Sequence, residues 1–205
     1  MKKGGVVIKK YDQLIHDLLQ KKQGLFRTAD FEASGIPRSY LSQLEKEGRI
    51  EKITWGVYSA SQTLLIPDEM HALQLRNQQA VFSHETALYL HGLSVRSPLN
   101  YSVTLPSGYH SEKLKEIGCK VYFVKTELHR LGQTTLPSSQ GNRLQVYDLE
   151  RTLCDVIRSR SRIDSQIFID AVKGYVKKTD KNLSRLTEYA RQFGVTKLVR
   201  QYIEV

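Results

Sequence analysis

The chain has 205 residues, of which 40% are hydrophobic and 25% are charged, a composition that excludes a largely disordered protein. Its length allows a module of about 60 residues followed by a second one of about 140. Lysine and arginine outnumber aspartate and glutamate by 31 to 21. The net charge of +10 favours a polyanionic partner, first nucleic acid and second an anionic membrane surface, if it does more than aid solubility.

The sequence predicts neither an export signal nor a membrane span. The N-terminus is basic, but its apolar run covers only residues 6–8, whereas a secretory signal needs about seven apolar residues or more. No stretch approaches the roughly 20 apolar residues of a membrane helix. Cys119 and Cys154 lack metal-binding spacing and fit buried thiols in a reducing compartment. We therefore expect a cytoplasmic protein without a membrane partner.

Residues 11–19 predict an amphipathic helix. Its apolar positions recur with helical spacing: Tyr11, Leu14, Ile15, Leu18 and Leu19. Basic residues and Gly24 end this helix, and residues 25–27 form a short extended entry. We expect Thr28 to cap a second helix over residues 29–34, which Gly35 ends.

Pro37 is expected to open a third helix that runs to Glu47, because proline suits the first helical position. A helix, a short turn and a further helix are typical of a helix-turn-helix, whose second helix enters the major groove. The inner face of the third helix is expected to hold Tyr40, Leu41 and Leu44. Its outer face then carries donors and small polar groups: Arg38, Ser39, Ser42, Gln43 and Lys46. Arg38 and Gln43 are the preferred base readers, because both can form bidentate pairs.

Residues 49–53 and 57–60 predict a hairpin around the turn at 54–56, which is the wing of a winged helix-turn-helix. Trp55 lies at the tip, where it either inserts at the DNA or packs on the hairpin; the sequence leaves both readings open. The module is expected to span residues 1–60 and to bind double-stranded DNA, since the cationic helix face argues against a protein-binding or structural winged helix. The expected DNA-binding residues are Arg27, Thr28, Arg38, Ser39, Ser42, Gln43, Lys46, Arg49, Lys52, Thr54 and Trp55.

The pattern of residues 61–205 predicts a larger α+β domain with a helical C-terminal end. A helix with Pro67 at its first position is followed by a brief strand at 81–82 and by a helix that Ser83 caps and Gly92 ends. Strands are predicted at 101–105, 119–124 and 143–147. From residue 148 onward, four apolar stripes predict four helices.

Positive charge is concentrated in the last third of the chain. Residues 151–200 contain twelve basic and five acidic residues, whereas residues 1–60 contain eleven and seven. Such a run is ordinarily a solvated helix face. The alternative, more specific hypothesis is a second surface that binds DNA or a partner. Its residues are Lys173, Lys177, Lys178, Lys181 and Arg185.

No catalytic or metal motif is present, whether a Gly-rich phosphate loop, GxSxG or HExxH. His84 is expected to cap a helix and His91 to pack, because a zinc site needs further ligands. Asp148 and Glu150 lie at a helix start, where the dipole alone explains them. Ser83 has no visible base. We expect no catalytic residue, no metal and no cofactor.

Several stretches together resemble the AbiEi family of antitoxins. In the first module these are 26–30, 35–41, 44–50 and 56–58; further on they are Ser83-His84-Glu85-Thr86-Ala87-Leu88-Tyr89-Leu90-His91-Gly92-Leu93 and Asp148-Leu149-Glu150-Arg151-Thr152-Leu153-Cys154-Asp155-Val156-Ile157-Arg158. They occur in the family's order over most of the chain. The sequence departs from the family pattern at Pro37, where the family often has Ser, and near Thr86.

The resemblance implies a type IV toxin–antitoxin pair that acts in abortive infection against phage. It implies a regulator that represses its own operon at promoter inverted repeats. We expect a monomer in solution or cooperative binding on DNA, and the repeats could be filled by a dimer or by two cooperating monomers. It also implies a nucleotidyltransferase-like toxin, which the C-terminal domain counteracts without a required stable complex. Two alternatives stay open: a ligand-responsive repressor without a toxin, and a DNA-processing enzyme.

Overall fold

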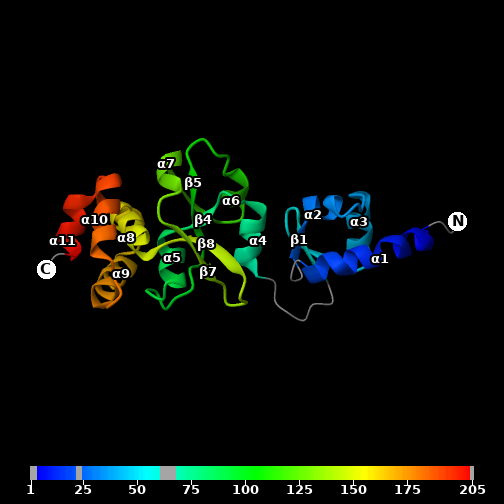
Figure 1. Ribbon diagram of the computed structural model, residues 1–205, viewed down its shortest axis with the longest axis horizontal. Helices are drawn as coiled ribbons and strands as arrows, with labels where there is room; N and C mark the ends of the chain where they lie inside the picture. The colour runs from blue at the N-terminus through cyan, green and yellow to red at the C-terminus, as the bar shows by residue number, and fades with distance from the viewer. Residues whose placement is uncertain (1–3, 22–24, 61–67, 204–205) are drawn as a thin grey trace. The chain divides into compact units, whose positions relative to one another are not determined.

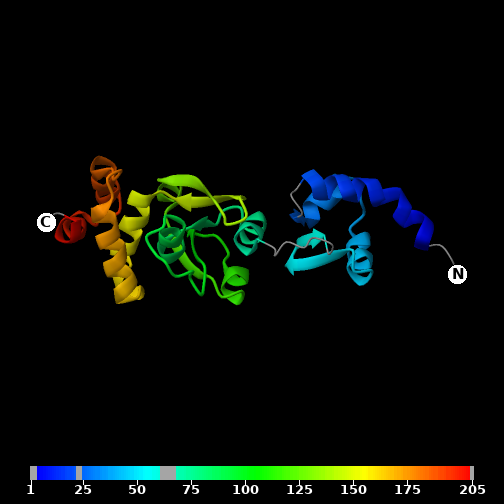
Figure 2. The ribbon, with the colours of Figure 1, turned by 90° about the horizontal axis from the view of Figure 1, so that it is seen from below.

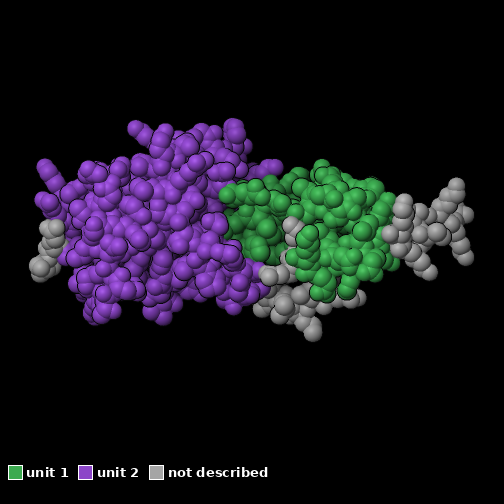
Figure 3. All heavy atoms as spheres, in the orientation of Figure 1, with its two compact units in different colours: residues 1–78 green, residues 79–205 purple. Residues whose placement is uncertain are grey.

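A computed structural model describes residues 4–21, 25–60 and 68–203. The chain divides into two compact units, unit 1 at Met1–Gln78 and unit 2 at Gln79–Val205, which Figure 3 colours separately. The architecture confirms the expected α+β class, with an N-terminal winged helix-turn-helix and a larger α+β region whose C-terminal end is helical.

Unit 1 packs helices on a small antiparallel sheet of strand order β1-β3-β2. Figure 1 labels its helices α1, α2, α3 and α4. Leu25 pairs with Ser59, and Lys52 pairs with Tyr58. The elements are α1 (Gly4–Lys21), β1 (Leu25–Arg27), α2 (Thr28–Ala33), α3 (Ser39–Lys46), β2 (Ile50–Thr54), β3 (Val57–Ala60) and α4 (Glu69–Arg76).

The two faces of this sheet pack against different helices. Adjacent strand residues point to opposite faces. Phe26 and Tyr58 therefore face the core of α1, α2 and α3, while their neighbours Leu25 and Val57 face a second cluster. The first core contains Ile15, Leu18, Phe31, Ile36, Leu41, Leu44 and Ile50, and the second adds Ile53, Ala72 and Leu75.

The second cluster explains why unit 1 is longer than expected. Ala72 and Leu75 belong to α4, which packs on β1, β2 and β3. The contacts therefore divide the chain after residue 78, whereas the sequence suggested a boundary after residue 60. A short helix after the wing gives no local signal of which unit it will cover.

Four predicted helix starts are displaced. Helix α1 begins at Gly4, ahead of the apolar stripe that starts at Tyr11. Helix α2 already includes Thr28, so Arg27 occupies the N-cap position expected for Thr28. Helix α3 begins at Ser39, because the carbonyl of Pro37 accepts from Tyr40 in a tighter first turn. Asp68 caps α4 by accepting from the His71 amide at 3.0 Å, so the helix starts at Glu69; Pro67 itself lies outside the described residues.

Unit 2 is built on a five-stranded mixed sheet of order β6-β5-β4-β8-β7 (Figures 1 and 2). Strands β5 and β6 are parallel, as are β4 and β8, and the remaining neighbours are antiparallel. The strands are β4 (Val81–Phe82), β5 (Ser102–Pro106), β6 (Lys120–Val124), β7 (Gln133–Pro137) and β8 (Arg143–Tyr147). Sequence reasoning missed β7, whose polar QTT start lacks a strand pattern.

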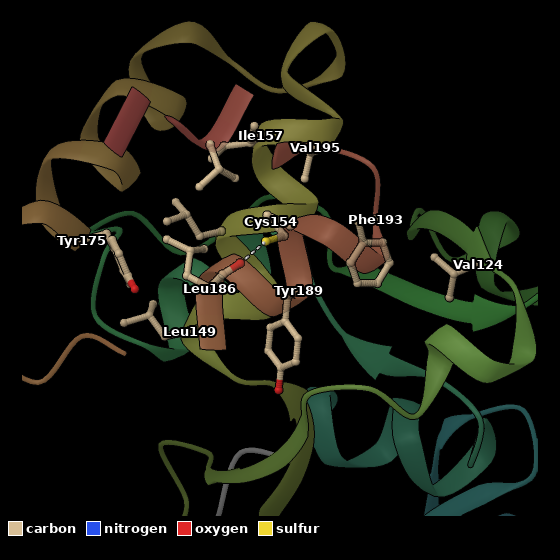
Figure 4. Packing of buried hydrophobic residues seen from close by; sticks show 12 residues of the cluster. Val124, Leu149, Cys154, Ile157, Tyr175, Leu186, Tyr189, Phe193 and Val195 are labelled. Atoms are coloured by element: carbon tan, nitrogen blue, oxygen red, sulfur yellow. Dashed lines mark hydrogen bonds between the residues drawn. The ribbon is translucent and has the colours of Figure 1, made fainter. Parts of the chain in front are cut away.

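Helix α8 is the centre of the helical part of unit 2, because it packs against α5, α9, α10 and α11. Figure 4 shows its residues Leu149, Cys154 and Ile157 among Leu186, Tyr189 and Phe193, with the Cys154 thiol 3.9 Å from the Leu186 carbonyl. The helices are α5 (His84–Leu90), α6 (Glu112–Glu116), α7 (Thr126–His129), α8 (Leu149–Arg158), a 3-10 turn (Arg160–Arg162), α9 (Ser165–Lys177), α10 (Leu183–Gln192) and α11 (Thr196–Ile203).

Within the described ranges, no helix combines the length and apolar character needed to cross a membrane.

Candidate nucleic-acid interface

Helix α3 separates an apolar face from a polar one. Leu41 and Leu44 are buried in the core of unit 1, and Tyr40 packs beside them. Four of the five polar residues expected on the outer face are exposed: Arg38, Ser39, Ser42 and Lys46. The structure thus presents two cations and two hydroxyls along one solvent-facing side of α3, the arrangement that contacts to phosphates and base edges require.

Gln43 differs from these four because it is half-buried. Its amide donates to the Glu47 carboxylate at 3.0 Å, one turn further along α3. A base contact by Gln43 would have to replace this local hydrogen bond. Of the two base readers expected from sequence, Arg38 is the one whose side chain has no such competing contact among the described residues.

Two further cations of unit 1 are engaged by carboxylates. The Arg27 guanidinium binds Asp30 through Nε at 3.0 Å and Nη2 at 3.1 Å, which raises the pKa of Arg27. Asp30 also accepts from the Arg27 backbone amide at 2.9 Å and thereby closes the first turn of α2. Arg49 pairs with Asp12 at 2.7 Å. These ion pairs partly neutralise both arginines and connect α2 and the wing to the rest of the unit.

The wing tip is a tight turn at Trp55 and Gly56 between β2 and β3. Gly56 has φ +76°, a conformation that favours glycine. The Trp55 side chain is 59% exposed, and the Lys52 ammonium lies 4.9 Å from its ring centre. Lys52 is exposed and Thr54 half-buried on the same strand. The tip therefore offers an aromatic ring and a cation together.

Arg76 is a wing residue that sequence reasoning missed. Arg76 is the last residue of α4 and lies 21 residues after Trp55 in the chain. Its Nη1 donates to the carbonyl of Trp55. The apolar spacing of residues 70–75 predicts the helix, but no local pattern indicates that its last residue reaches the wing. The wing is therefore supported by residues beyond position 60.

The second basic surface, expected at residues 173–185, is only partly available. Lys181 donates to the carbonyls of Val176 and Lys178 at 3.1 and 2.9 Å, where it satisfies the end of α9. Lys178 pairs with Asp180 at 3.4 Å, and Arg185 lies 3.7 Å from Asp148. Lys173 and Lys177 are exposed on α9.

His84 does not cap its helix as the sequence suggested. The side chain is fully buried, and its ring nitrogens lie 2.9 Å from the Ser83 hydroxyl and 3.1 Å from the Ser159 hydroxyl. Its ring stacks on Tyr122 with centres 3.5 Å apart. Burial, together with surrounding cations, lowers the pKa of His84 well below its usual range. Its φ of +47° is unusual for a residue other than glycine.

Ser83 and His91 likewise serve the fold of unit 2. Ser83 occupies the N-cap position of α5, but its hydroxyl accepts from Thr104 at 2.9 Å instead of from a helix amide. His91 lies 2.8 Å from the Tyr147 carbonyl. These polar groups join α5 to the sheet at its buried side.

Asp148 and Glu150 also have structural partners. Asp148 caps α8 by accepting from the Arg151 amide at 2.9 Å and from the Tyr189 hydroxyl at 2.9 Å. Glu150 accepts from the Asn182 amide at 2.8 Å. In the described parts of the chain, no three His, Cys, Asp or Glu side chains gather closely enough to hold a metal ion.

Arg151 of unit 2 is fully buried. Its Nε binds Asp155 at 2.9 Å, and its Nη1 donates to the carbonyls of Leu128 and Leu131. Tyr147 and Phe193 cover the guanidinium at 3.9 and 4.1 Å. The motif at 148–158 thus fixes α8 to the segment between β6 and β7.

The solvent-facing row on α3, followed by a hairpin with an exposed tip, defines unit 1 as a winged helix-turn-helix. Residues 13–60 match the family model described as "Transcriptional regulator, AbiEi antitoxin". Within this stretch the resemblance expected from the sequence is confirmed, because the module is similar to that of the AbiEi antitoxin transcriptional regulators.

The fold of the whole chain is similar to that of a solved bacterial protein. The crystal structure of the RV2827C protein from Mycobacterium tuberculosis superposes with a TM-score of 0.64 over 95% of this chain and 80% of that one, at 12% sequence identity. An identity this low shows a shared fold and no more. No protein with a curated description matches the sequence.

Proposed function

We propose that the protein is a DNA-binding antitoxin that represses its own operon by binding inverted repeats in the promoter. The exposed row Arg38, Ser39, Ser42 and Lys46 carries this proposal, because it places two cations and two hydroxyls opposite the buried Leu41 and Leu44. Arg38 reads a base edge and Lys46 contacts phosphate, while Lys52, Thr54 and Trp55 of the wing contact the backbone or minor groove.

Arg27, Thr28, Gln43 and Arg49 belong to the same proposed interface in supporting roles. Arg27 stabilises the first turn of α2 through Asp30, and Gln43 bonds Glu47 along α3. Arg49 joins the start of the wing to Asp12 of α1, and the Thr28 amide donates to the Gly56 carbonyl of the wing turn. The proposal extends to unit 2 through Lys173 and Lys177, since their neighbours Lys178, Lys181 and Arg185 are engaged within the chain. The protein binds each repeat as a monomer or cooperatively on DNA.

Binding to the upstream promoter fragment tests the DNA proposal. A labelled fragment should be shifted saturably, and log K should fall with log salt by about 0.9 per phosphate contact. The double variant Arg38→Ala/Lys46→Ala should lose the shift. The matched control Arg96→Ala removes an exposed arginine from unit 2 and should bind as wild type. Equal binding to unrelated DNA at every salt concentration would contradict operator recognition.

The second part of the proposal is that unit 2 counteracts a nucleotidyltransferase-like toxin in the cytoplasm, as one member of a phage-defence pair. Co-expression with the neighbouring gene from an unrelated promoter tests it. The full chain should relieve toxicity, and Arg38→Ala/Lys46→Ala should relieve it equally, because repression plays no part in that arrangement. A neighbouring gene that is harmless, or a toxicity that the full chain cannot relieve, would favour a ligand-responsive repressor without a toxin.

A further inference from the structure

Helix α4 covers one whole face of the wing sheet. Ala72 is 1% exposed and packs with Leu25 and Val57, and Leu75 and Ile53 border this cluster. Without α4, the apolar side chains of this face would lie open to water. The helix is thus part of the core of unit 1.

The last residue of α4 contacts the wing tip itself. Arg76 Nη1 donates to the Trp55 carbonyl. A Cβ at Gly56 would lie 3.4 Å from the same nitrogen, so the guanidinium fits closely against the turn. On the other side of the turn, the Gly56 carbonyl accepts from the Thr28 amide at 3.0 Å. Both carbonyls of the turn are therefore bonded, one by α2 and one by α4.

We infer that Arg76 is a positioning residue for the wing, which fixes the tip so that Trp55 is presented in one orientation to the DNA backbone. The inference rests on the proposed function for its consequence in DNA binding. An exposed hairpin tip with free carbonyls samples many orientations, and ordering it on DNA costs affinity. Two hydrogen bonds from packed helices remove part of that cost before DNA arrives.

A direct phosphate contact by the Arg76 guanidinium is the competing explanation, and the two make different predictions. A lost phosphate contact lowers the slope of log K against log salt by about 0.9. A lost positioning contact weakens binding with the slope unchanged. In addition, a residue that acts through Trp55 has no further effect once the indole is removed.

The single tryptophan of the chain makes the test specific, because all indole fluorescence comes from the wing tip. The variant Arg76→Met keeps the aliphatic stem on α4 and removes the donor and the charge. Arg96→Met is the matched control in an exposed loop of unit 2. Thermal unfolding of both full-length variants checks that the fold is retained.

We expect Arg76→Met to lower the fluorescence anisotropy of Trp55 and to raise its quenching by acrylamide in the DNA-free protein. Operator binding should weaken about fivefold, the factor that corresponds to one hydrogen bond of about 1 kcal/mol. The salt slope should stay unchanged, and Arg76→Met should add nothing in a Trp55→Ala background. Arg96→Met should resemble wild type in each measurement.

Unchanged anisotropy and quenching in Arg76→Met would overturn the inference, and so would a slope lowered by about 0.9 with effects that add to those of Trp55→Ala. If Trp55 responds to Arg76→Met but the wild-type protein binds no promoter DNA, the positioning role stands and the proposed function fails. The fluorescence measurements thus test the positioning role of Arg76, and the DNA-binding measurements test the proposed function.

Discussion

The two units differ in where their polar residues lie. In unit 1 the polar residues of α3 face solvent and the buried set is almost wholly apolar, whereas unit 2 buries His84, Glu85, Arg151 and Asp155 in its interior. Unit 1 therefore keeps the cations of this helix face, Arg38 and Lys46, available for a partner. Unit 2 uses buried charges within its fold: Glu85 joins α5 to Lys120 of β6, and Arg151 joins α8 to the segment between β6 and β7. The polar motifs at 83–93 and 148–158 belong to that scaffold.

The largest expected effect follows from breaking the buried pair in unit 2. Arg151→Ala removes the 2.9 Å partner of the buried Asp155 and leaves it the longer 3.5 Å contact to the partly exposed Arg158, which should destabilise the protein by about 3–5 kcal/mol. Urea unfolding followed by circular dichroism measures the loss. Trp55 fluorescence, which reports on unit 1, should show a much smaller change. Arg96→Ala removes an exposed arginine from a loop of unit 2 and serves as the control. Equal stability of both variants would mean that the pair contributes little.

In unit 1 we expect a smaller effect, on DNA recognition and not on stability. Arg38→Ala should cost about 1–3 kcal/mol of discrimination between the operator and a variant base pair. Its stability should stay within about 0.5 kcal/mol of wild type, because the side chain is exposed. Competition binding with mutated operators and thermal unfolding measure the two quantities. A destabilised Arg38→Ala protein with unchanged discrimination would remove the contrast between the units.

A pH titration sharpens the contrast further, because the strongly shifted histidine lies in unit 2. Burial lowers the pKa of His84, while the unfolded chain titrates near 6.5. Below pH 6.5 the imidazole of His84 therefore binds a proton in the unfolded state but stays neutral in the folded state. The free energy of unfolding should fall by about 1.4 kcal/mol per pH unit from this group.

The variant His84→Asn tests that assignment, since Asn tolerates a positive φ and does not titrate. The difference in stability between wild type and His84→Asn should shrink as the pH falls below 6.5. His110→Asn, at an exposed position, should retain the wild-type profile. A profile of His84→Asn that runs parallel to wild type would assign the pH dependence to other groups.

The smallest effect concerns the lysines of α9. Lys173→Ala/Lys177→Ala should lower the salt slope of operator binding by about 1.8 if both contact phosphate, and should leave stability unchanged. Lys181→Ala is the informative comparison, because its ammonium satisfies carbonyls at the end of α9. That variant should lose stability without changing the slope. The reverse pattern would place the second surface at Lys181.

The sequence by itself determined the parts of the protein that depend on neighbours along the chain. The apolar spacing of α1 and α3, the wing hairpin and the four C-terminal helices follow from contacts within a few turns or one tight turn. The exposed row of α3 was predictable for the same reason, because Leu41 and Leu44 define the buried face.

Tertiary structure alone decided where the polar side chains of unit 2 and the last residue of α4 would go. Ser159 reaches His84 across 75 residues, Arg151 reaches the Leu128 carbonyl across 23, and Arg76 reaches the wing across 21. Such pairs depend on packing between elements, which periodicity does not encode. For that reason the sequence suggested a wing complete at residue 60, whereas the structure completes it with α4.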